Sequence, residues 1–280
     1  MSGLVLEGGA FRGAYTDGVL DALLDEDILF PYVIGVSAGA GNAYSYVSLQ
    51  RGRNFKILER YRGDKRYFGA RNFLKQKSIF GIDFIYNEIP NRLIPYDYQA
   101  LKKYSGEIVT VVTNALTGKA EYFEKEKAEP TFAILRASCA LPMLFPPIFI
   151  DKTPYYDGGI ADPIPILKSI EDGNDKNLIV LTREIEYRKS PPGKETMLTI
   201  KAMRKKYPKI AELMEIRHIE YNRSVELCNQ LESEGKAVVL RPSASVNVGR
   251  LEKDITKLRR LYRAGYDDTK KQLPTIKELF

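Results

Sequence analysis

The chain has 280 residues, of which 44% are hydrophobic and 28% charged, and its formal net charge is +7. This length suits one large α/β domain, and no segment approaches the ~20 apolar residues that a transmembrane helix requires. Its two cysteines, Cys139 and Cys228, form neither a disulfide framework nor a metal-ligand cluster, which indicates a reducing, cytosolic compartment.

The first predicted elements are a short buried strand at residues 4–6 and a helix beyond residue 13, joined by a glycine-rich turn. Such a turn presents several backbone N–H groups to one point and can hold an anion. Two anions are compatible with it: a nucleotide phosphate and the oxyanion of an acyl-transfer intermediate. Gly8, Gly9 and Gly13 do not fit the dinucleotide fingerprint, and the Gly-Lys-Ser/Thr of a P-loop is absent, which disfavours a nucleotide-binding module.

The next predicted strand, residues 32–36, ends in the pentapeptide Gly35-Val36-Ser37-Ala38-Gly39. This is the pattern of a nucleophile elbow, in which a serine occupies a sharp turn between a buried strand and a helix. Glycine is expected at positions 35 and 39 because a Cβ there would collide with the neighbouring strand or helix. The N-terminus of the following helix favours negative charge beside Ser37, so the elbow favours the oxyanion interpretation of the glycine-rich turn.

Residues 51–78 form a strongly basic stretch with interleaved aromatic residues. Its basic residues are Arg51, Arg53, Lys56, Arg60, Arg62, Lys65, Arg66, Arg71, Lys75 and Lys77. The stretch is either a solvated face or an interfacial loop that docks on anionic lipid headgroups, and residues 201–206 are a second docking candidate. No nucleic-acid-binding motif accompanies the charge, which disfavours DNA or RNA as a partner. Residues 79–93 are predicted to be helical and either cover the site or pack on the sheet.

The rest of the chain alternates between strands and helices, which predicts a mostly parallel sheet covered on both faces. Strands are predicted at residues 107–113, 120–124, 148–151, 154–156, 177–182 and 236–241, and helices at 131–139, 210–227 and 249–271.

A serine nucleophile needs a proton acceptor. His218, the only histidine, lies within a predicted helix on its apolar side rather than on a loop at the sheet edge, so we expect a packed or surface residue. Without a histidine, a carboxylate must act as the base. Asp157 is the leading candidate because it ends an apolar strand and is followed by Gly158 and Gly159, which permit close approach. By itself, Asp-Gly-Gly favours an ordinary turn over a catalytic site.

Three motifs occur together at residues 8–13, 35–39 and 157–159. In this order and spacing they resemble the patatin-like phospholipase family, and residues 137–147 resemble the segment that precedes the family's aspartate. The resemblance covers roughly residues 3–182. Beyond it, residues 183–280 are only loosely similar to a bacterial subgroup of the family.

The resemblance implies a three-layer α/β/α fold with a mostly parallel central sheet and a helical C-terminal region, in a single domain over residues 1–280. It implies a Ser37–Asp157 dyad and an oxyanion hole made by the N–H groups of Gly8, Gly9 and Ala10. The supporting residues would be Arg12, which braces the loop, together with Gly13, Gly35, Gly39, Gly158 and Gly159.

The implied activity is hydrolysis of lipid acyl esters, of phospholipase A, lysophospholipase or esterase type, with no metal or cofactor. The alternative is a weakly active or non-enzymatic lipid-binding regulator that keeps the fold. The expected location is the cytoplasm, with transient binding to the anionic inner membrane surface and no nucleic acid partner.

One residue departs from the family pattern, which usually has a third glycine where this chain has Ala10. Alanine still offers its N–H but disfavours positive φ, at a cost of about 1 kcal/mol if the loop requires it. A valine at Gly9 is expected to be severe, since a β-branched residue resists positive φ and would crowd the oxyanion.

Overall fold

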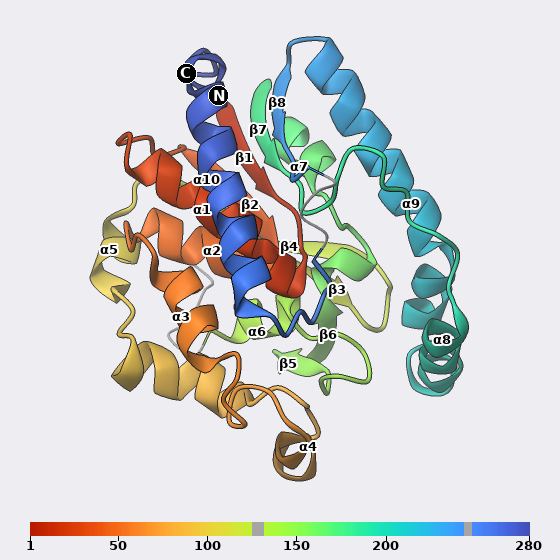
Figure 1. The fold of residues 1–280 in the computed structure, drawn as a ribbon. Coiled ribbons are helices and arrows are strands. Elements are labelled where there is room, and N and C mark those ends of the chain that lie inside the picture. Colours follow the sequence, from red (N-terminus) through yellow and green to blue (C-terminus); the bar gives the residue numbers. More distant parts are fainter. Residues whose placement is uncertain (125–131, 244–247) are drawn as a thin grey trace.

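An eight-stranded mixed sheet runs through the centre of the molecule (Figure 1). The computed structural model describes residues 1–124, 132–243 and 248–280. The strand order is β5-β6-β3-β2-β1-β7-β8, and β4 pairs with β3 outside this path. The strands are β1 (Ser2–Leu6), β2 (Tyr32–Val36), β3 (Glu107–Asn114), β4 (Ala120–Glu124), β5 (Ile148–Ile150), β6 (Thr153–Asp157), β7 (Lys176–Val180) and β8 (Ala237–Leu240).

Neighbouring strands from β3 through β2, β1 and β7 to β8 pair in parallel, whereas β4 and β6 pair antiparallel with β3, and β5 antiparallel with β6. The α-helices are α1 (Ala14–Leu24), α2 (Ala38–Val47), α3 (Arg53–Tyr61), α4 (Ala70–Gln76), α5 (Tyr98–Lys103), α6 (Ala133–Ser138), α7 (Ile166–Glu171), α8 (Lys194–Lys206), α9 (Pro208–Ser233) and α10 (Ile255–Lys277). Two 3-10 helices, η1 (Ala10–Gly13) and η4 (Gly158–Ile160), and a π-helix, η2 (Phe84–Leu93), complete the described elements.

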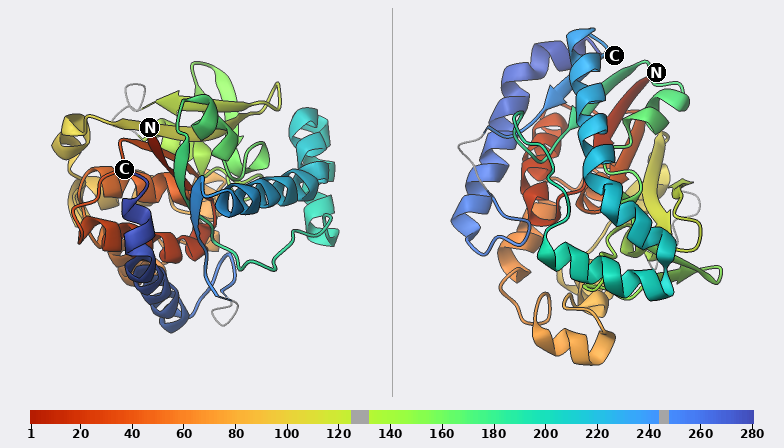
Figure 2. Two further views of the ribbon diagram at one scale, coloured as in Figure 1. Left: turned by 90° about the horizontal axis from the view of Figure 1, so that it is seen from above. Right: turned by 90° about the vertical axis from the view of Figure 1, so that its right-hand side faces the viewer.

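The parallel strands β1, β2, β3, β7 and β8 are buried on both faces, as their β-branched residues predict, whereas β4 is only partly buried. Leu4 and Leu6 point into one core with α1, α2 and α10, while Val5 points into a second core with α7 and α9. Figure 2 shows these two helical layers on opposite sides of the strands. The predicted three-layer α/β/α fold with a mostly parallel sheet is confirmed.

Helices α1 and α10 pack backbone against backbone. A Cβ added at Gly18 would lie 1.9 Å from the carbonyl oxygen of Tyr262, and one added at Gly265 would lie 2.1 Å from that of Tyr15. This approach buries the acidic side of α1, where Asp21 accepts hydrogen bonds from Tyr262 Oη and Gly52 N. The helix is therefore buried nearly all round.

Several predicted elements differ in the structure, among them the helix predicted at 210–227, which runs from Pro208 to Ser233. The basic stretch is not one loop, because it contains α3, whose Phe55, Leu58 and Tyr61 pack on the core at helical spacing, and the short α4. The last helix begins at Ile255 instead of residue 249, since Asp254 caps it by accepting a hydrogen bond from Thr256 N. The helix predicted at 131–139 starts at Ala133 in the described part, and residue 131 lies outside the described residues.

None of the helices that the structure describes combines the length and the hydrophobicity needed to cross a bilayer.

Candidate active site

The predicted elbow is a strained turn between β2 and α2. Ser37 has φ 53° and ψ −121°, a conformation that non-glycine residues rarely adopt. A Cβ at Gly35 would lie 2.7 Å from Ala40 N, and one at Gly39 would lie 2.5 Å from Leu6 O. These contacts are too short for any larger residue, so the strand and the helix approach closely enough to hold Ser37 at the end of β2.

The structure brings Ser37 and Asp157 together from strands that are distant in sequence. Ser37 Oγ donates a hydrogen bond of 2.8 Å to Asp157 Oδ2, and Gly159 N donates one of 2.8 Å to Asp157 Oδ1. Asp157 sits at the end of β6, opposite Val112 of β3, and is buried. Burial raises the pKa of Asp157, and the hydrogen bond from Ser37 and the positive charge of Arg217 oppose that rise. The pair has the geometry of a nucleophile and its base.

Two residues that the sequence did not single out hold this pair. Arg217, on α9, donates a hydrogen bond from Nε to the carbonyl oxygen of Gly159, directly after the aspartate turn. Ser138, at the end of α6, accepts a 2.8 Å hydrogen bond from Ser37 N. Ser138 belongs to the segment whose resemblance to the family was noted, whereas nothing local marked Arg217.

The glycine loop lies beside the elbow. A Cβ on Gly8 would come within 3.1 Å of Ser37 Cβ. Among the described residues, the backbone N–H groups of Gly8, Gly9 and Ala10 donate no hydrogen bond to any other group, so all three remain free for a ligand. Ala10 has φ +48°, so the loop does require the conformation that alanine disfavours.

The expected reason for glycine at position 9 is wrong. Gly9 has φ −163°, which is extended backbone that any residue adopts. Glycine is needed there for a different reason, because a Cβ would lie 2.8–3.1 Å from the side chain of Thr182. Thr182 cannot easily move away, since its N and Oγ1 both donate to the buried carboxylate of Glu7.

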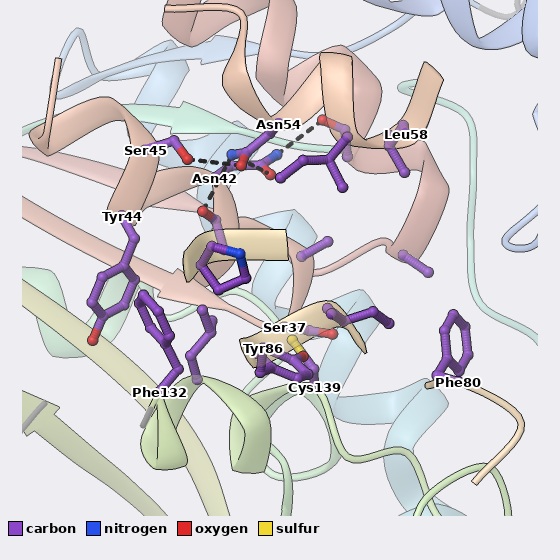
Figure 3. Close-up of a pocket in the computed structure, with 18 of the residues that line it drawn as sticks. Ser37, Asn42, Tyr44, Ser45, Asn54, Leu58, Phe80, Tyr86, Phe132 and Cys139 are labelled. Atoms are coloured by element: carbon purple, nitrogen blue, oxygen red, sulfur yellow. Dashed lines mark hydrogen bonds between the residues drawn. The ribbon is translucent and has the colours of Figure 1, made fainter. Parts of the chain in front are cut away.

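An apolar cavity of about 210 Å³ opens on one side of Ser37 (Figure 3). Aromatic and aliphatic side chains from α2, α3, η2 and α6 line most of it, and Asn42, Ser45 and Asn54 form a hydrogen-bonded cluster at one end. Residues 79–93 contribute Phe80, Ile85, Tyr86 and Pro90 to the lining. This segment therefore covers the site, which was one of its two predicted roles.

A second, polar cavity also borders Ser37 and is lined by the glycine loop and Asp157. Arg12, expected to brace the loop, is buried beside this cavity, and among the described residues its guanidinium forms no hydrogen bond. Its backbone N–H donates to Gly9 O. Gly13 serves the elbow instead, because its carbonyl accepts a hydrogen bond from Asn42 on α2.

His218 is on α9, next to Arg217, and borders neither of the two cavities that Ser37 joins. We expect His218→Ala to leave the kcat for ester hydrolysis within about twofold of wild type, because the imidazole lines neither cavity at Ser37. A collapse of kcat in a variant with an unchanged melting temperature would contradict this and restore a Ser-His-Asp triad.

Comparisons with known proteins agree with this architecture. The family model of patatin-like phospholipases matches residues 4–169, which is more than half of the chain. The chain belongs to the patatin-like phospholipase family. A second match, to a domain of unknown function (DUF6363), covers residues 207–280.

Relatives of this patatin-like chain include an uncharacterized protein, YjjU, of Escherichia coli K12, which is 27% identical over 64% of the chain and 50% of its own length. A probable lipid hydrolase, 463L, of invertebrate iridescent virus 6 is 28% identical over 62% of the chain and 65% of its own length. A lysophospholipase, nte1, of Aspergillus niger is 27% identical over 59% of the chain and 11% of its own length. The chain thus spans less than two thirds of each of these relatives.

The crystal structure of VipD from Legionella pneumophila shares the fold, with a TM-score of 0.50 and 16% identity over 98% of this chain and 67% of that one. The likeness therefore extends beyond the patatin-like region to the C-terminal strand and helices.

Proposed function

We propose that this chain is a lipid acyl hydrolase in which Ser37 is the nucleophile and Asp157 its base, within one domain over residues 1–280. The observation that carries the proposal is the 2.8 Å hydrogen bond from Ser37 Oγ to Asp157 Oδ2, placed beside an apolar cavity. Family membership and two relatives described as a lipid hydrolase and a lysophospholipase support it.

In the first half-reaction, Asp157 accepts the Ser37 proton as Oγ attacks the ester carbonyl, and the acyl chain occupies the apolar cavity. The free N–H groups of residues 8–10 stabilise the oxyanion. Loss of one such donor commonly raises the activation barrier by about 3 kcal/mol. Protonated Asp157 then returns its proton to the leaving alcohol. In the second half, Asp157 activates a water molecule that releases the fatty acid and regenerates Ser37.

Hydrolysis of a panel of lipid esters and a short-chain p-nitrophenyl ester by wild type and Ser37→Ala tests this function. Turnover by wild type and not by the variant supports it. Tight lipid binding without turnover by wild type would instead identify a non-enzymatic lipid-binding protein.

Membrane docking would bring the cavity to its substrate, and we propose that the α4 surface, formed by Lys65, Arg71, Phe73, Leu74, Lys75 and Lys77, makes this contact. Phe73 and Leu74 are 48% and 86% exposed, and within the described chain the four cations form no ion pair. The loop that carries α4 is closed by a bridge between Phe68 and Phe80, and Phe80 lines the apolar cavity. Docking here would place the cavity beside the bilayer.

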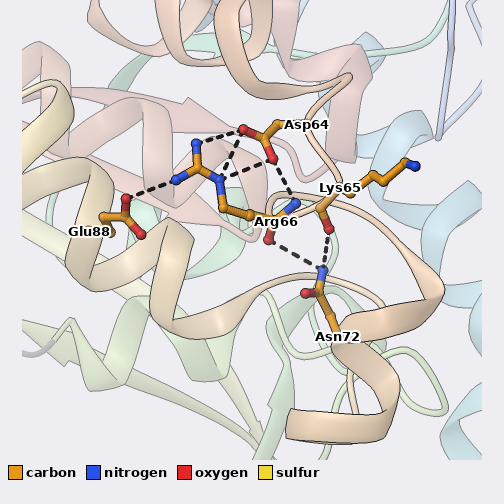
Figure 4. Close-up of polar contacts among 5 residues, drawn as sticks. All are labelled: Asp64, Lys65, Arg66, Asn72 and Glu88. Carbon is orange, nitrogen blue, oxygen red and sulfur yellow. Dashed lines mark hydrogen bonds and ion pairs between the residues drawn. The ribbon is translucent and has the colours of Figure 1, made fainter.

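Not every cation of the basic stretch is available for docking. Arg66 pairs with Asp64 and Glu88, and Asn72 donates to the carbonyl oxygens of Lys65 and Arg66 (Figure 4). Reversing the charge of Arg66 would therefore disturb the loop itself, and Arg66 is left out of the docking test.

We expect the triple variant Lys65→Glu, Arg71→Glu, Lys75→Glu to bind vesicles rich in anionic lipid at least about a hundredfold more weakly, since each basic residue contributes about 1 kcal/mol. Wild-type binding should weaken as salt is raised toward molar concentration. Hydrolysis of a soluble ester should be unchanged.

The matched control is the triple variant Lys103→Glu, Lys119→Glu, Lys253→Glu, which makes the same change in net charge elsewhere on the surface. Equal losses in both triple variants, or salt-independent binding, would show that the α4 charges only solvate the surface.

A further inference from the structure

The polar cavity beside Ser37 is a void of about 40 Å³, roughly three times the space that one water molecule needs. Five basic side chains line it: Arg12, Arg183, Lys189, Arg217 and Arg250. They come from four segments, since Arg183 and Lys189 share the loop between β7 and α8. All except Arg12 lie outside the residues that match the patatin-like family model. Two of them, Arg217 and Arg250, belong to the C-terminal domain of unknown function.

The protein neutralises this cation cluster only in part, because two carboxylates face five cations. Glu7 and Asp157 are the only carboxylates among the lining residues that the structure describes. Glu7 already accepts hydrogen bonds from Thr182 and Tyr221, and Asp157 from Ser37 and Gly159. Within the described residues, none of the five cations lies within ion-pair distance of a carboxylate.

Several donors in the cluster have unused hydrogen-bonding capacity. Arg12 is only 8% exposed, and the Nε atoms of Arg12 and Arg183 are buried without a partner in the described chain. Burial and the charges of Arg217 and Arg250 lower the pKa of Lys189 to about 7, and burial and the charge of Arg183 lower the pKa of Arg12 to about 10. Buried donors and charges left unpaired are costly, and a bound anion would remove that cost.

We propose that the cation cluster binds the phosphate group in the headgroup of the lipid substrate. Ser37 borders both cavities, so an ester whose acyl chain fills the apolar cavity directs its alcohol portion into the polar one. Guanidinium groups match the oxygens of phosphate in a bidentate geometry, and several of them converge here. The C-terminal domain would thereby select substrates that the patatin-like region hydrolyses. This inference rests on the hydrolase function proposed above.

The test compares two soluble substrates with the same acyl chains, dihexanoyl phosphatidylglycerol and dihexanoylglycerol, below their aggregation concentrations. We expect wild type to have at least about tenfold higher kcat/KM for the phosphate-bearing substrate. In Lys189→Gln, Arg250→Gln and the double variant, this preference should fall, by about tenfold or more in the double variant. Arg250 is exposed, so its replacement is compatible with folding.

The matched control is Arg223→Gln, which removes an exposed arginine from the same helix as Arg217 but outside the cavity. It should leave kcat/KM for both substrates unchanged. An equal preference in wild type and the double variant would overturn the assignment of the cluster to the headgroup.

A binding arm uses inorganic phosphate alone, at constant ionic strength, on the Ser37→Ala protein. At tenfold excess over Kd, phosphate should raise the melting temperature by about 3 °C, and this rise should vanish when Lys189→Gln and Arg250→Gln are added.

Stabilisation by phosphate without a substrate preference would assign the site to free phosphate and overturn the lipid-headgroup assignment. Failure of both arms would overturn the site altogether. If no ester is hydrolysed, the hydrolase function fails, and the phosphate arm still decides whether the anion site exists.

Discussion

Replacing Ser37 with alanine, or Asp157 with asparagine, is expected to lower kcat/KM for a short-chain p-nitrophenyl ester by about 10³-fold or more. The first change removes the attacking oxygen. The second removes the one carboxylate, within the described part of the chain, that accepts a hydrogen bond from that oxygen. Losses of this size are typical when a member of a nucleophile–base pair is removed. The backbone contacts that shape the elbow do not involve either side chain, so both variants should keep the fold, as judged by circular dichroism and the melting temperature.

The wild-type pH profile gives an independent check on Asp157. The base must be ionised to accept the Ser37 proton, and burial raises its pKa above the usual aspartate range. Activity should therefore be present above this raised pKa and be lost as the pH falls through it. Substantial residual activity in Asp157→Asn, or a main acidic limb that persists in that variant, would contradict the dyad.

The second large effect is expected at the glycine loop, where Gly9→Val should lower kcat/KM by about 10²-fold or more. The new Cβ would press on Thr182, which is anchored to Glu7, so the loop must move instead. Moving the loop displaces the N–H groups that face the carbonyl, and loss of one oxyanion donor costs about 10²–10³ in rate. The measurement is kcat/KM on the same ester, with a thermal melt to show that the variant is folded.

Ala10→Gly is the control within the same loop. Glycine adopts φ +48° without the penalty that alanine carries, so its activity should stay within about tenfold of wild type or rise. If Gly9→Val and Ala10→Gly had equal and mild effects, the loop would not face the reacting carbonyl.

The elbow could be predicted from sequence because its causes are local. The β-branched run before Gly35 and the small residues after Ser37 specify the strand, the turn and the helix within a dozen residues. The same holds for Asp157, which is marked by an apolar strand before it and two glycines after it. Where two backbone segments approach too closely for a Cβ, only glycine fits, so the sequence shows the constraint directly.

The helices of the basic stretch were harder to recognise. In α3 the apolar positions Phe55, Leu58 and Tyr61 have helical spacing, but abundant arginine and lysine between them obscured the pattern. For a surface helix, the spacing of apolar residues is a stronger indicator than overall polarity, since one buried apolar stripe is enough to hold the helix on the core.

The cation cluster had no local signal at all. Arg217 is adjacent to His218, yet only the packing of α9 on η4 shows which of the two reaches the site. Arg183, Lys189 and Arg250 each occur in an ordinary polar segment and acquire meaning only when the fold gathers them around one void. Convergence of distant segments is a tertiary property that a single sequence does not display.

The central position of β1 has a consequence for how the protein folds. This strand pairs with β2 on one side and β7 on the other, and Glu7 at its end bonds to Thr182 and Tyr221, 175 and 214 positions further along. Contacts of such long range form slowly, and at 5–20 residues per second the ribosome needs roughly ten to thirty-five seconds to deliver Thr182 after Glu7. Until then, the edge of β1 that later pairs with β7 is exposed and can pair with another chain. The glycine loop after β1 also lacks its contact with Thr182. The glycine loop therefore leaves the ribosome early and is among the last parts of the molecule to acquire a fixed shape.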